Sequence, residues 1–120
     1  MGYFFDTYAI IELVKENLNY SRFKDEEIIT TALNLGEFYL SCLKIKDTES
    51  GEKWCNLLHD STLSIELETV KKAMKFKLEN KKKNLSFVDS VSYLIAKENG
   101  LKFLTGDKEF EGMENVEFVK

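Results

Sequence analysis

Hydrophobic and polar positions divide this chain into two kinds of segment, which alternate from one end to the other. Short apolar or alternating runs are typical of strands, and they predict five, at residues 2–5, 28–31, 63–67, 101–105 and 116–119. Longer segments with apolar residues at helical spacing predict five helices, at residues 7–16, 32–45, 52–59, 68–82 and 86–98. Polar stretches at 17–21 and 47–51 interrupt the pattern, and Asn99-Gly100 is a helix-ending signal.

This alternation of strands and helices favours one fold class. Strands joined through helices form mostly parallel sheets that are covered by helices on both faces. The expected architecture is therefore an α/β fold, a three-layer α/β/α sandwich around a sheet of about five strands. A chain of 120 residues with no long linker and no internal repeat is expected to form a single domain, residues 1–120.

Composition and charge exclude several classes of protein. The chain is 43% hydrophobic and 32% charged, which is ordinary for a globular domain. Its formal net charge of −4 argues against a basic polyanion binder, but not against an enzyme that reaches phosphates through bound cations. No apolar run approaches the length of a membrane span and no leader pattern opens the chain, so a cytoplasmic protein is expected. Cys42 and Cys55 are expected to be reduced thiols rather than a disulfide.

Two carboxylates lie just after predicted strands. Asp6 ends the first strand and Asp107 comes two residues after the strand at 101–105. Ligands of open α/β sheets bind at the carboxyl ends of strands, where both side chains would lie. Each residue also has a structural alternative, because Asp6 could cap the next helix and Asp107 could serve a turn.

Two further carboxylates lie on predicted helices. Glu37 has Leu33, Leu40 and Ser41 as its helical neighbours, so the pattern places it on or beside an apolar face, where an unpaired charge is costly. A functional role is preferred over a core-edge pair with Arg22 or a lysine. Asp89 begins a largely apolar helix, and its alternative role is that of the acid in a capping box with Ser86.

These four acids would repel one another if they converged, unless they are protonated or bound to cations. Few basic residues occur in the apolar segments that carry them. Hard divalent ions, Mg²⁺ or Mn²⁺, are the usual partners of such oxygen clusters. A site of this kind can polarise a phosphodiester and activate water for an in-line displacement. The sequence therefore predicts a metal-dependent nuclease.

The order and spacing of the acids also resemble a known family. The opening strand ends in Asp6-Thr7, and a helix carries Glu37 within Leu33-Asn34-Leu35-Gly36-Glu37-Phe38. The segment from Leu85 through Asp89 to Thr105-Gly106-Asp107-Lys108-Glu109-Phe110 is the most specific part. Together these motifs resemble the PIN-domain nucleases, especially the VapC-like toxins, over the whole length of the chain.

The resemblance implies a function and a set of site residues. Asp6, Glu37, Asp89 and Asp107 would be the catalytic, metal-binding carboxylates, with Thr105, Glu109 and Thr7 in support and Phe110 as a packing residue. The family's usual activity is that of a Mg²⁺- or Mn²⁺-dependent endoribonuclease. VapC-like members are inhibited by a cognate antitoxin protein and often form homodimers. Because some members have lost activity, a non-catalytic module that binds protein or RNA is the alternative.

Other residues are expected to have structural roles. His59 fits a helix end on the surface better than a general base, and the lysines of segment 71–83 fit a solvated helix face better than an RNA guide. Trp54, Phe38 and Tyr39 suit core packing as well as base stacking. No glycine-rich nucleotide loop occurs, and a phosphoaspartyl enzyme is disfavoured because Asp6-Thr7-Tyr8 lacks the second acid of that motif.

Overall fold

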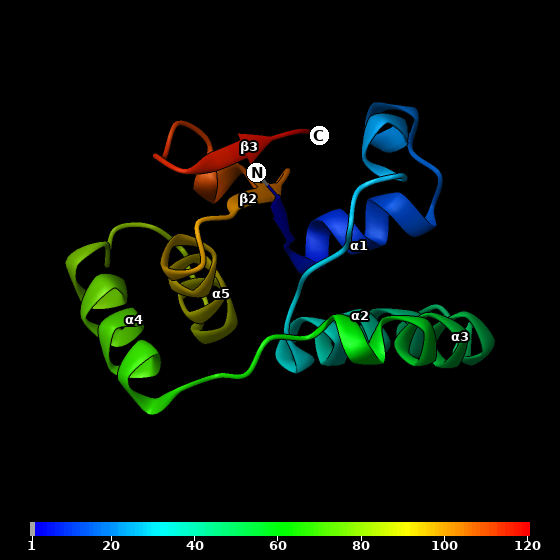
Figure 1. Ribbon diagram of the computed structural model, residues 1–120, viewed down its shortest axis with the longest axis horizontal. Helices are drawn as coiled ribbons and strands as arrows, with labels where there is room; N and C mark the ends of the chain where they lie inside the picture. Colours follow the sequence, from blue (N-terminus) through cyan, green and yellow to red (C-terminus); the bar gives the residue numbers. More distant parts are fainter. Residues whose placement is uncertain (1) are drawn as a thin grey trace.

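A parallel sheet lies between two groups of helices in the computed structural model, which describes residues 2–120 (Figure 1). The sheet contains β1 (Tyr3–Phe5), β2 (Lys102–Thr105) and β3 (Val116–Phe118) in the order β1-β2-β3. Phe5 pairs with Leu104, and Thr105 pairs with Phe118. The carboxyl ends of all three strands therefore lie at the same edge of the sheet.

Five α-helices and three short 3₁₀ helices complete the fold of the described residues 2–120. One face of the sheet is covered by α1 (Thr7–Val14), α2 (Ala32–Lys44), α3 (Thr48–Leu58) and the 3₁₀ helix η1 (Leu18–Phe23). The other face is covered by α4 (Leu67–Glu79) and α5 (Phe87–Glu98). The remaining 3₁₀ helices are η2 (His59–Ser61) and η3 (Lys108–Phe110). The expected three-layer α/β/α architecture is confirmed.

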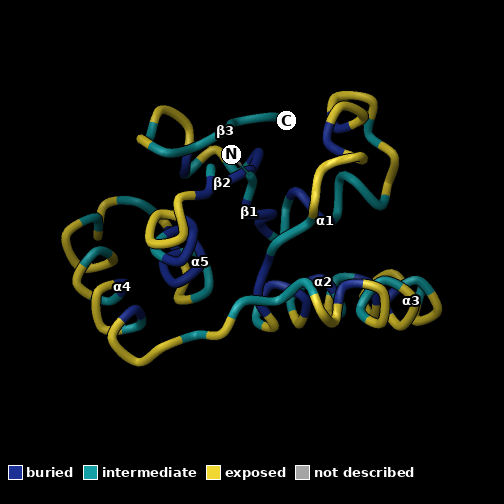
Figure 2. Tube along the Cα trace, viewed as in Figure 1, coloured by how far each residue is buried: buried dark blue, intermediate teal, exposed yellow. Residues whose placement is uncertain are grey.

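Alternating strand residues divide the core into two halves. Phe4 and Phe103 are fully buried against α4 and α5, whereas Phe5 and Leu104 are fully buried against α1 and α2. Successive side chains of a strand point to opposite faces, so a strand covered on both sides is apolar at every position. Half of the residues of α5 are buried as well, the dark part of its tube in Figure 2. Phe110 packs among the aromatic rings of this half, as expected.

The sheet is smaller than expected, because neither the segment at 28–31 nor the segment at 63–67 forms a strand ladder; only 28–31 takes part in isolated bridges. Ile29 bridges Phe4 and Thr30 bridges Thr62, both in parallel. The segment at 28–31 therefore continues the sheet beyond β1 without a ladder of its own. The prediction for 63–67 was wrong. Leu63 donates one bond to the Thr30 carbonyl and Leu67 already begins α4.

Two predicted loops were also wrong. Residues 48–51, expected to be a polar turn, form the start of α3, where the Asp47 side chain accepts a bond from the Ser50 amide. The stretch at 17–21 lies largely in η1, which is capped by Asn17. The predicted helix ends at Glu16, Ile45 and Lys82 lie past the observed ends of α1, α2 and α4. Side-chain caps, rather than apolar periodicity, define the first residue of α3 and η1.

Several simpler expectations were tested as well. Cys42 and Cys55 are both free thiols, as expected. Within residues 2–120, each helix falls short of the length and apolar character that a membrane crossing requires.

Candidate functional site

Asp6 is the most deeply placed of the predicted acids. It follows β1, where its amide donates to the Leu104 carbonyl, and its residue is only 3% exposed. Although it occupies the N-cap position of α1, its side chain makes no capping hydrogen bond. Desolvation by burial raises the pKa of Asp6 to about 7, Asp89 and Glu37 raise it further, and hydrogen bonds from the Thr105 hydroxyl and the Thr7 backbone lower it. The helix-cap alternative therefore does not explain this residue.

Thr105 joins the ends of two strands. Its buried hydroxyl donates to Oδ2 of Asp6 at 2.7 Å and accepts a hydrogen bond of 3.1 Å from the amide of Asp107. Thr105 ends β2, which lies directly beside β1, so the pairing register places this hydroxyl next to Asp6. Thr105 is thus hydrogen-bonded to Asp6 and lies beside it, where the sequence motif placed it.

Glu37 reaches the same region from α2. Its Oε1 accepts a hydrogen bond of 2.6 Å from the hydroxyl of Thr7, the first residue of α1. The reasoning that placed Glu37 on an apolar face was only partly correct, because Leu40 is 50% exposed and the buried face of α2 is formed by other residues. Those buried residues are Asn34, Leu35, Phe38 and Cys42. Arg22, the suggested partner, pairs instead with Glu117.

Asp89 has the capping role that was its structural alternative. Its Oδ2 accepts from the Ser86 amide at 2.8 Å, and the Ser86 hydroxyl accepts from the Asp89 amide at 3.0 Å. Within the described chain its other oxygen, Oδ1, has no hydrogen bond. Burial raises the pKa of Asp89 from its usual value, hydrogen bonds with Ser86 lower it, Asp107 raises it and the positive charge of Lys77 lowers it. One carboxylate oxygen therefore fixes the helix start and the other remains available.

Asp107 and Glu109 lie in the segment that follows β2. Asp107 caps η3, with Oδ1 accepting from the Glu109 amide at 3.0 Å. The Glu109 carboxylate accepts from the Asn84 amide at 2.9 Å, which directs it toward the connection between α4 and α5. Asp107 therefore also has the structural role in a turn that was its alternative. The carboxylate of Glu109, by contrast, contacts the α4–α5 connection.

The four acids influence one another electrostatically without forming a closed cage. The negative charges of Asp89 and Glu37 raise the pKa of Asp6, and the negative charge of Asp107 raises the pKa of Asp89. None of the four pairs with a lysine, arginine or histidine in the part of the chain that the structure describes. Among residues 2–120, however, no three acidic, histidine or cysteine ligands surround a common point closely enough to hold an ion. The acids are neighbours in one acidic region rather than a preformed coordination shell.

This donor set fits a hard divalent cation. Carboxylate oxygens are the ligands that Mg²⁺ and Mn²⁺ prefer, and Mg²⁺ usually keeps several waters while it binds only one or two carboxylates. Burial and the neighbouring acids raise the pKa of Asp6, which means that its negative charge is unfavourable in the protein alone. A bound cation would stabilise this charge and would offset the repulsion among the carboxylates. Asp6, Asp89, Asp107 and Glu37 are the residues that would hold it.

A buried polar network supports this region and was missed by the sequence analysis. Asn34 is fully buried, and its Nδ2 donates to the Thr7 hydroxyl at 3.2 Å. Its Oδ1 accepts from Thr31 at 2.6 Å and from Ser92 at 3.0 Å. The network therefore connects α1, α2 and α5 behind Glu37. The signal that the sequence offered for this network was Asn34, a polar residue on the side of α2 that faces the core.

Gly106 was also missed. It is buried between Thr105 and Asp107, and a β-carbon there would overlap the Tyr8 ring and the Val119 carbonyl oxygen. Only glycine fits this close approach, which fixes the backbone between the two polar residues. The small residue in Thr-Gly-Asp was the available signal.

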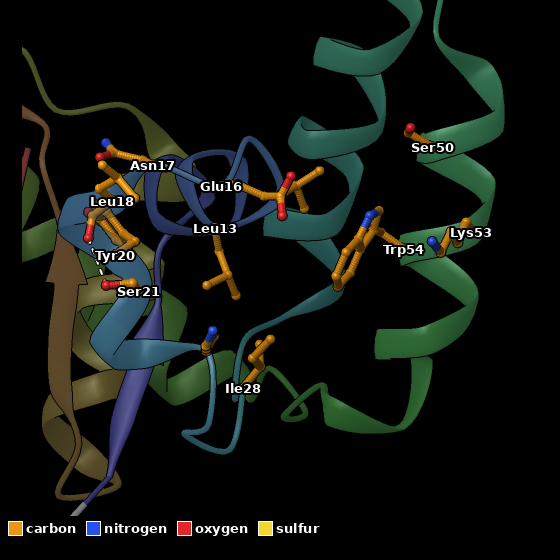
Figure 3. A pocket seen from close by; sticks show the side chains of 12 residues that line it. Leu13, Glu16, Asn17, Leu18, Tyr20, Ser21, Ile28, Ser50, Lys53 and Trp54 are labelled. Carbon is orange, nitrogen blue, oxygen red and sulfur yellow. Dashed lines mark hydrogen bonds between the residues drawn. The ribbon is translucent and has the colours of Figure 1, made fainter.

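Two cavities differ in their relation to the acids. One of about 420 Å³ includes Thr7 and Glu37 and extends along α2 past Ser41 to Lys44. The larger one, about 590 Å³, lies between α1, η1 and α3, away from the acids, and Figure 3 shows Trp54 directed into it near Ile28.

His59 is exposed beside Asp60, as expected for a surface histidine. Phe38 is a core residue, while Tyr39 is half-buried and bonds Glu52.

Comparison with known proteins identifies the family. A model of the PIN domain family matches residues 3–116. Among curated proteins no match was found. Similar solved structures include the toxin VapC20 of Mycobacterium tuberculosis, which cleaves the sarcin-ricin loop (TM-score 0.82, 16% identity, 99% of this chain and 100% of that one).

Two other similar structures have the same level of identity. One is a toxin-antitoxin complex from Klebsiella pneumoniae, with a TM-score of 0.76, 16% identity and coverage of 97% of this chain and 96% of that chain. The other is PAE2754 from Pyrobaculum aerophilum, with a TM-score of 0.73, 16% identity and coverage of 98% and 90%. At such identity these structures establish a shared fold, whereas the family match covers nearly the whole chain. The chain belongs to the PIN domain family.

Proposed function

We propose that this protein is a Mg²⁺- or Mn²⁺-dependent endoribonuclease whose metal-binding acids are Asp6, Glu37, Asp89 and Asp107. The observation that carries the proposal is the buried carboxyl of Asp6, which has acidic neighbours and no basic partner within the described residues. Burial of this kind is unfavourable for folding, and strongly perturbed carboxyls cluster at functional sites. A role in binding a cation explains why the chain tolerates it.

The residues of the chain have distinct tasks in this proposal. Thr105 orients Asp6 through its hydrogen bond, and Thr7 orients Glu37 in the same way. The capping bond from Ser86 fixes one oxygen of Asp89 and leaves the other without a hydrogen bond among the described residues. Lewis acidity toward a phosphodiester is the chemistry that a divalent ion supplies when bound. A water near the carboxylates would lose a proton to them as it attacks phosphorus; one P–O ester bond of the RNA then breaks, and its leaving oxygen takes up a proton from solvent.

RNA as the substrate and an antitoxin as a partner are supported by the similar structures. VapC20 cleaves an RNA loop, and another similar structure is a toxin-antitoxin complex. We extend RNA cleavage and inhibition by a cognate antitoxin protein to this chain as a VapC-like toxin. The resemblance to that family adds the proposal that it acts in the cytoplasm and works as a homodimer. Expression of the chain alone is then expected to arrest growth, and coexpression of its antitoxin is expected to restore it.

Metal-dependent cleavage by the purified protein tests this proposal. Wild type is expected to cut single-stranded RNA internally with Mg²⁺ or Mn²⁺ and to stop in excess EDTA. Asp6→Asn, which keeps the shape of the side chain, is expected to lose at least about 100-fold in rate, on the scale of other preorganised catalytic groups. Asp60→Asn changes an exposed acid beside His59 and is the matched control with wild-type activity. Equal cleavage by Asp6→Asn, or cleavage that survives EDTA, would contradict the proposal.

A non-catalytic PIN module that binds RNA or protein is the second candidate. It is favoured by one observation, the lack of three ligands around a common point within residues 2–120. This candidate predicts RNA binding without cleavage in either Mg²⁺ or Mn²⁺. The same purified protein therefore discriminates the two functions.

A further inference from the structure

Glu109 contacts the connection between α4 and α5 through both its side chain and its backbone. Its Oε1 accepts from the Asn84 amide at 2.9 Å, and its carbonyl oxygen accepts from the ammonium of Lys83 at 3.2 Å. The resemblance to PIN nucleases suggested a supporting acid at this position. The hydrogen bonds instead assign its carboxylate to a neighbouring loop.

The contacted loop is a tight basic turn. The Lys83 amide donates to the Asn80 carbonyl at 2.8 Å, which leaves Lys81 and Lys82 at the tip. A bond of 2.7 Å from Lys77 Nζ to the Leu85 carbonyl fixes the other side of the connection. Lys81 and Lys82 are exposed and form no ion pair in the described part of the chain. The turn therefore presents two uncompensated positive charges to solvent.

This turn is attached to two of the candidate metal-binding acids. On one side, the Glu109 amide donates to Asp107 Oδ1 at 3.0 Å. On the other side, Ser86, three residues beyond Lys83, donates through its amide to Asp89 Oδ2 at 2.8 Å. Glu109 thus connects the segment of Asp107 with the segment of Asp89, and the basic turn lies where these segments meet.

We propose that Glu109 is a positioning residue that holds the Lys81–Lys83 turn beside Asp89 and Asp107, where its lysines contact RNA phosphates that flank the cleaved bond. This inference rests on the proposed ribonuclease function. A region of four carboxylates in a chain of net charge −4 repels a polyanion at long range. Lysines on a turn that is bonded to the Asp107 and Asp89 segments provide a local attraction for the strand.

Paired substitutions of Glu109 test the positioning role. Glu109→Gln keeps an oxygen that can accept from the Asn84 amide, whereas Glu109→Ala removes it. Hydrogen exchange at the Asn84 amide is expected to stay near wild type in Glu109→Gln and to accelerate at least about tenfold in Glu109→Ala. KM for RNA is expected to stay near wild type in Glu109→Gln and to rise in Glu109→Ala. The kcat of Glu109→Gln is expected to change little. A loss of kcat in Glu109→Gln as large as in Glu109→Ala would overturn the positioning role in favour of a metal-binding acid.

Paired lysine substitutions test the contact with RNA. The double variant Lys81→Ala/Lys82→Ala is compared with Lys24→Ala/Lys102→Ala, which removes the same charge at the end of η1 and at the amino end of β2. Binding of a short fluorescein-labelled single-stranded RNA is measured in EDTA over a range of NaCl concentrations. Loss of two phosphate contacts is expected to reduce the slope of log K against log salt by about 1.4. An equal slope change in both double variants would overturn the assignment, because net charge alone would then explain it.

These readouts separate failure of this inference from failure of the proposed function. Binding in EDTA and amide exchange require no cleavage. A wild-type protein that does not cleave RNA refutes the nuclease proposal, while the lysine and Glu109 variants still decide whether the turn binds RNA. A cleaving wild type with unchanged binding in Lys81→Ala/Lys82→Ala refutes only the present inference.

Discussion

The hydroxyl of Thr105 lies 2.7 Å from Oδ2 of Asp6, and both residues are almost completely buried at the carboxyl ends of adjacent parallel strands. The same hydroxyl accepts from the Asp107 amide, so one small side chain serves two of the candidate acids. This arrangement fixes the orientation of Asp6, while burial and, to a lesser extent, the neighbouring Asp89 and Glu37 raise its pKa. The consequences for stability and activity can be measured separately.

Thr105→Val is expected to lower both stability and activity. Valine has nearly the same shape, but it removes the donor to Asp6 and leaves the Asp107 amide without its acceptor. Loss of these buried partners costs about 1–3 kcal/mol. Urea unfolding measures this change, and metal-stimulated RNA cleavage is expected to fall in parallel. Thr105→Ser keeps the hydroxyl and serves as the control, so a Ser variant as impaired as the Val variant would show that packing, not hydrogen bonding, matters.

The stability of the metal-free protein is expected to depend on Asp6 and pH. Its pKa is about 7 in the folded chain and 3.8 in the reference state, so the folded state holds this proton more tightly. The associated stability is present below pH 3.8 and is lost as pH rises toward 7. Asp6→Asn avoids this loss, and in EDTA at pH 8 it is expected to be more stable than wild type by up to about 4 kcal/mol.

Urea unfolding at several pH values in EDTA checks this expectation. The advantage of Asp6→Asn is expected to shrink steadily toward pH 4, and Mg²⁺ is expected to stabilise wild type but not the variant at pH 8. A constant difference between the two proteins across this pH range would contradict the assignment of the raised pKa to Asp6.

Gly106→Ala is expected to disturb the Asp107 segment. A β-carbon there overlaps the Tyr8 ring and the Val119 carbonyl, and relief of such overlap in a packed region costs about 1–3 kcal/mol. Thermal unfolding and RNA cleavage measure the effect. Gly36→Ala is a matched control, because its β-carbon meets nothing within 4 Å and alanine favours the helix. Equal effects of the two substitutions would exclude the close approach as the cause.

Asn34→Leu is expected to be among the more destabilising substitutions outside the four acids. It removes the partner of three hydroxyls, those of Thr7, Thr31 and Ser92. Unsatisfied buried groups cost about 1–3 kcal/mol each, although neighbouring relaxation reduces the total. Ser92→Ala removes a single bond and is expected to have a smaller effect in urea unfolding. A larger effect for Ser92→Ala would show that the network is not centred on Asn34.

The strands were predictable where the pattern of apolar residues was compatible with only one kind of secondary structure. Continuous apolar runs at β1 and β2 indicated strands buried on both faces, and both are present. Alternation at 63–67 indicated an extended backbone with one buried face, but only the start of that segment finds a hydrogen-bonding partner. Strand pairing depends on neighbours distant in sequence, and periodicity does not report them.

The placement of two candidate acids after neighbouring strands was predictable, but the contacts that support the candidate site were not. The positions of Asp6 and Asp107 follow from the rule that ligands bind at strand carboxyl ends. The physical argument for Glu37 was weaker than it looked, because Leu40 faces solvent and Thr7 supplies the contact. Asn34 joins three elements that are far apart in sequence, and no local pattern specifies its partners. Glu109 matched a motif, yet its hydrogen bond to Asn84 depends on how the α4–α5 connection packs.

Anomalous scattering from crystals soaked in Mn²⁺ tests the central claim most directly. We predict a manganese peak bound by Asp6 together with at least one of Asp89, Asp107 and Glu37, and no peak at this position in Asp6→Asn crystals. Manganese found only at other acids, or bound equally in Asp6→Asn, would contradict a metal-dependent active site built on Asp6.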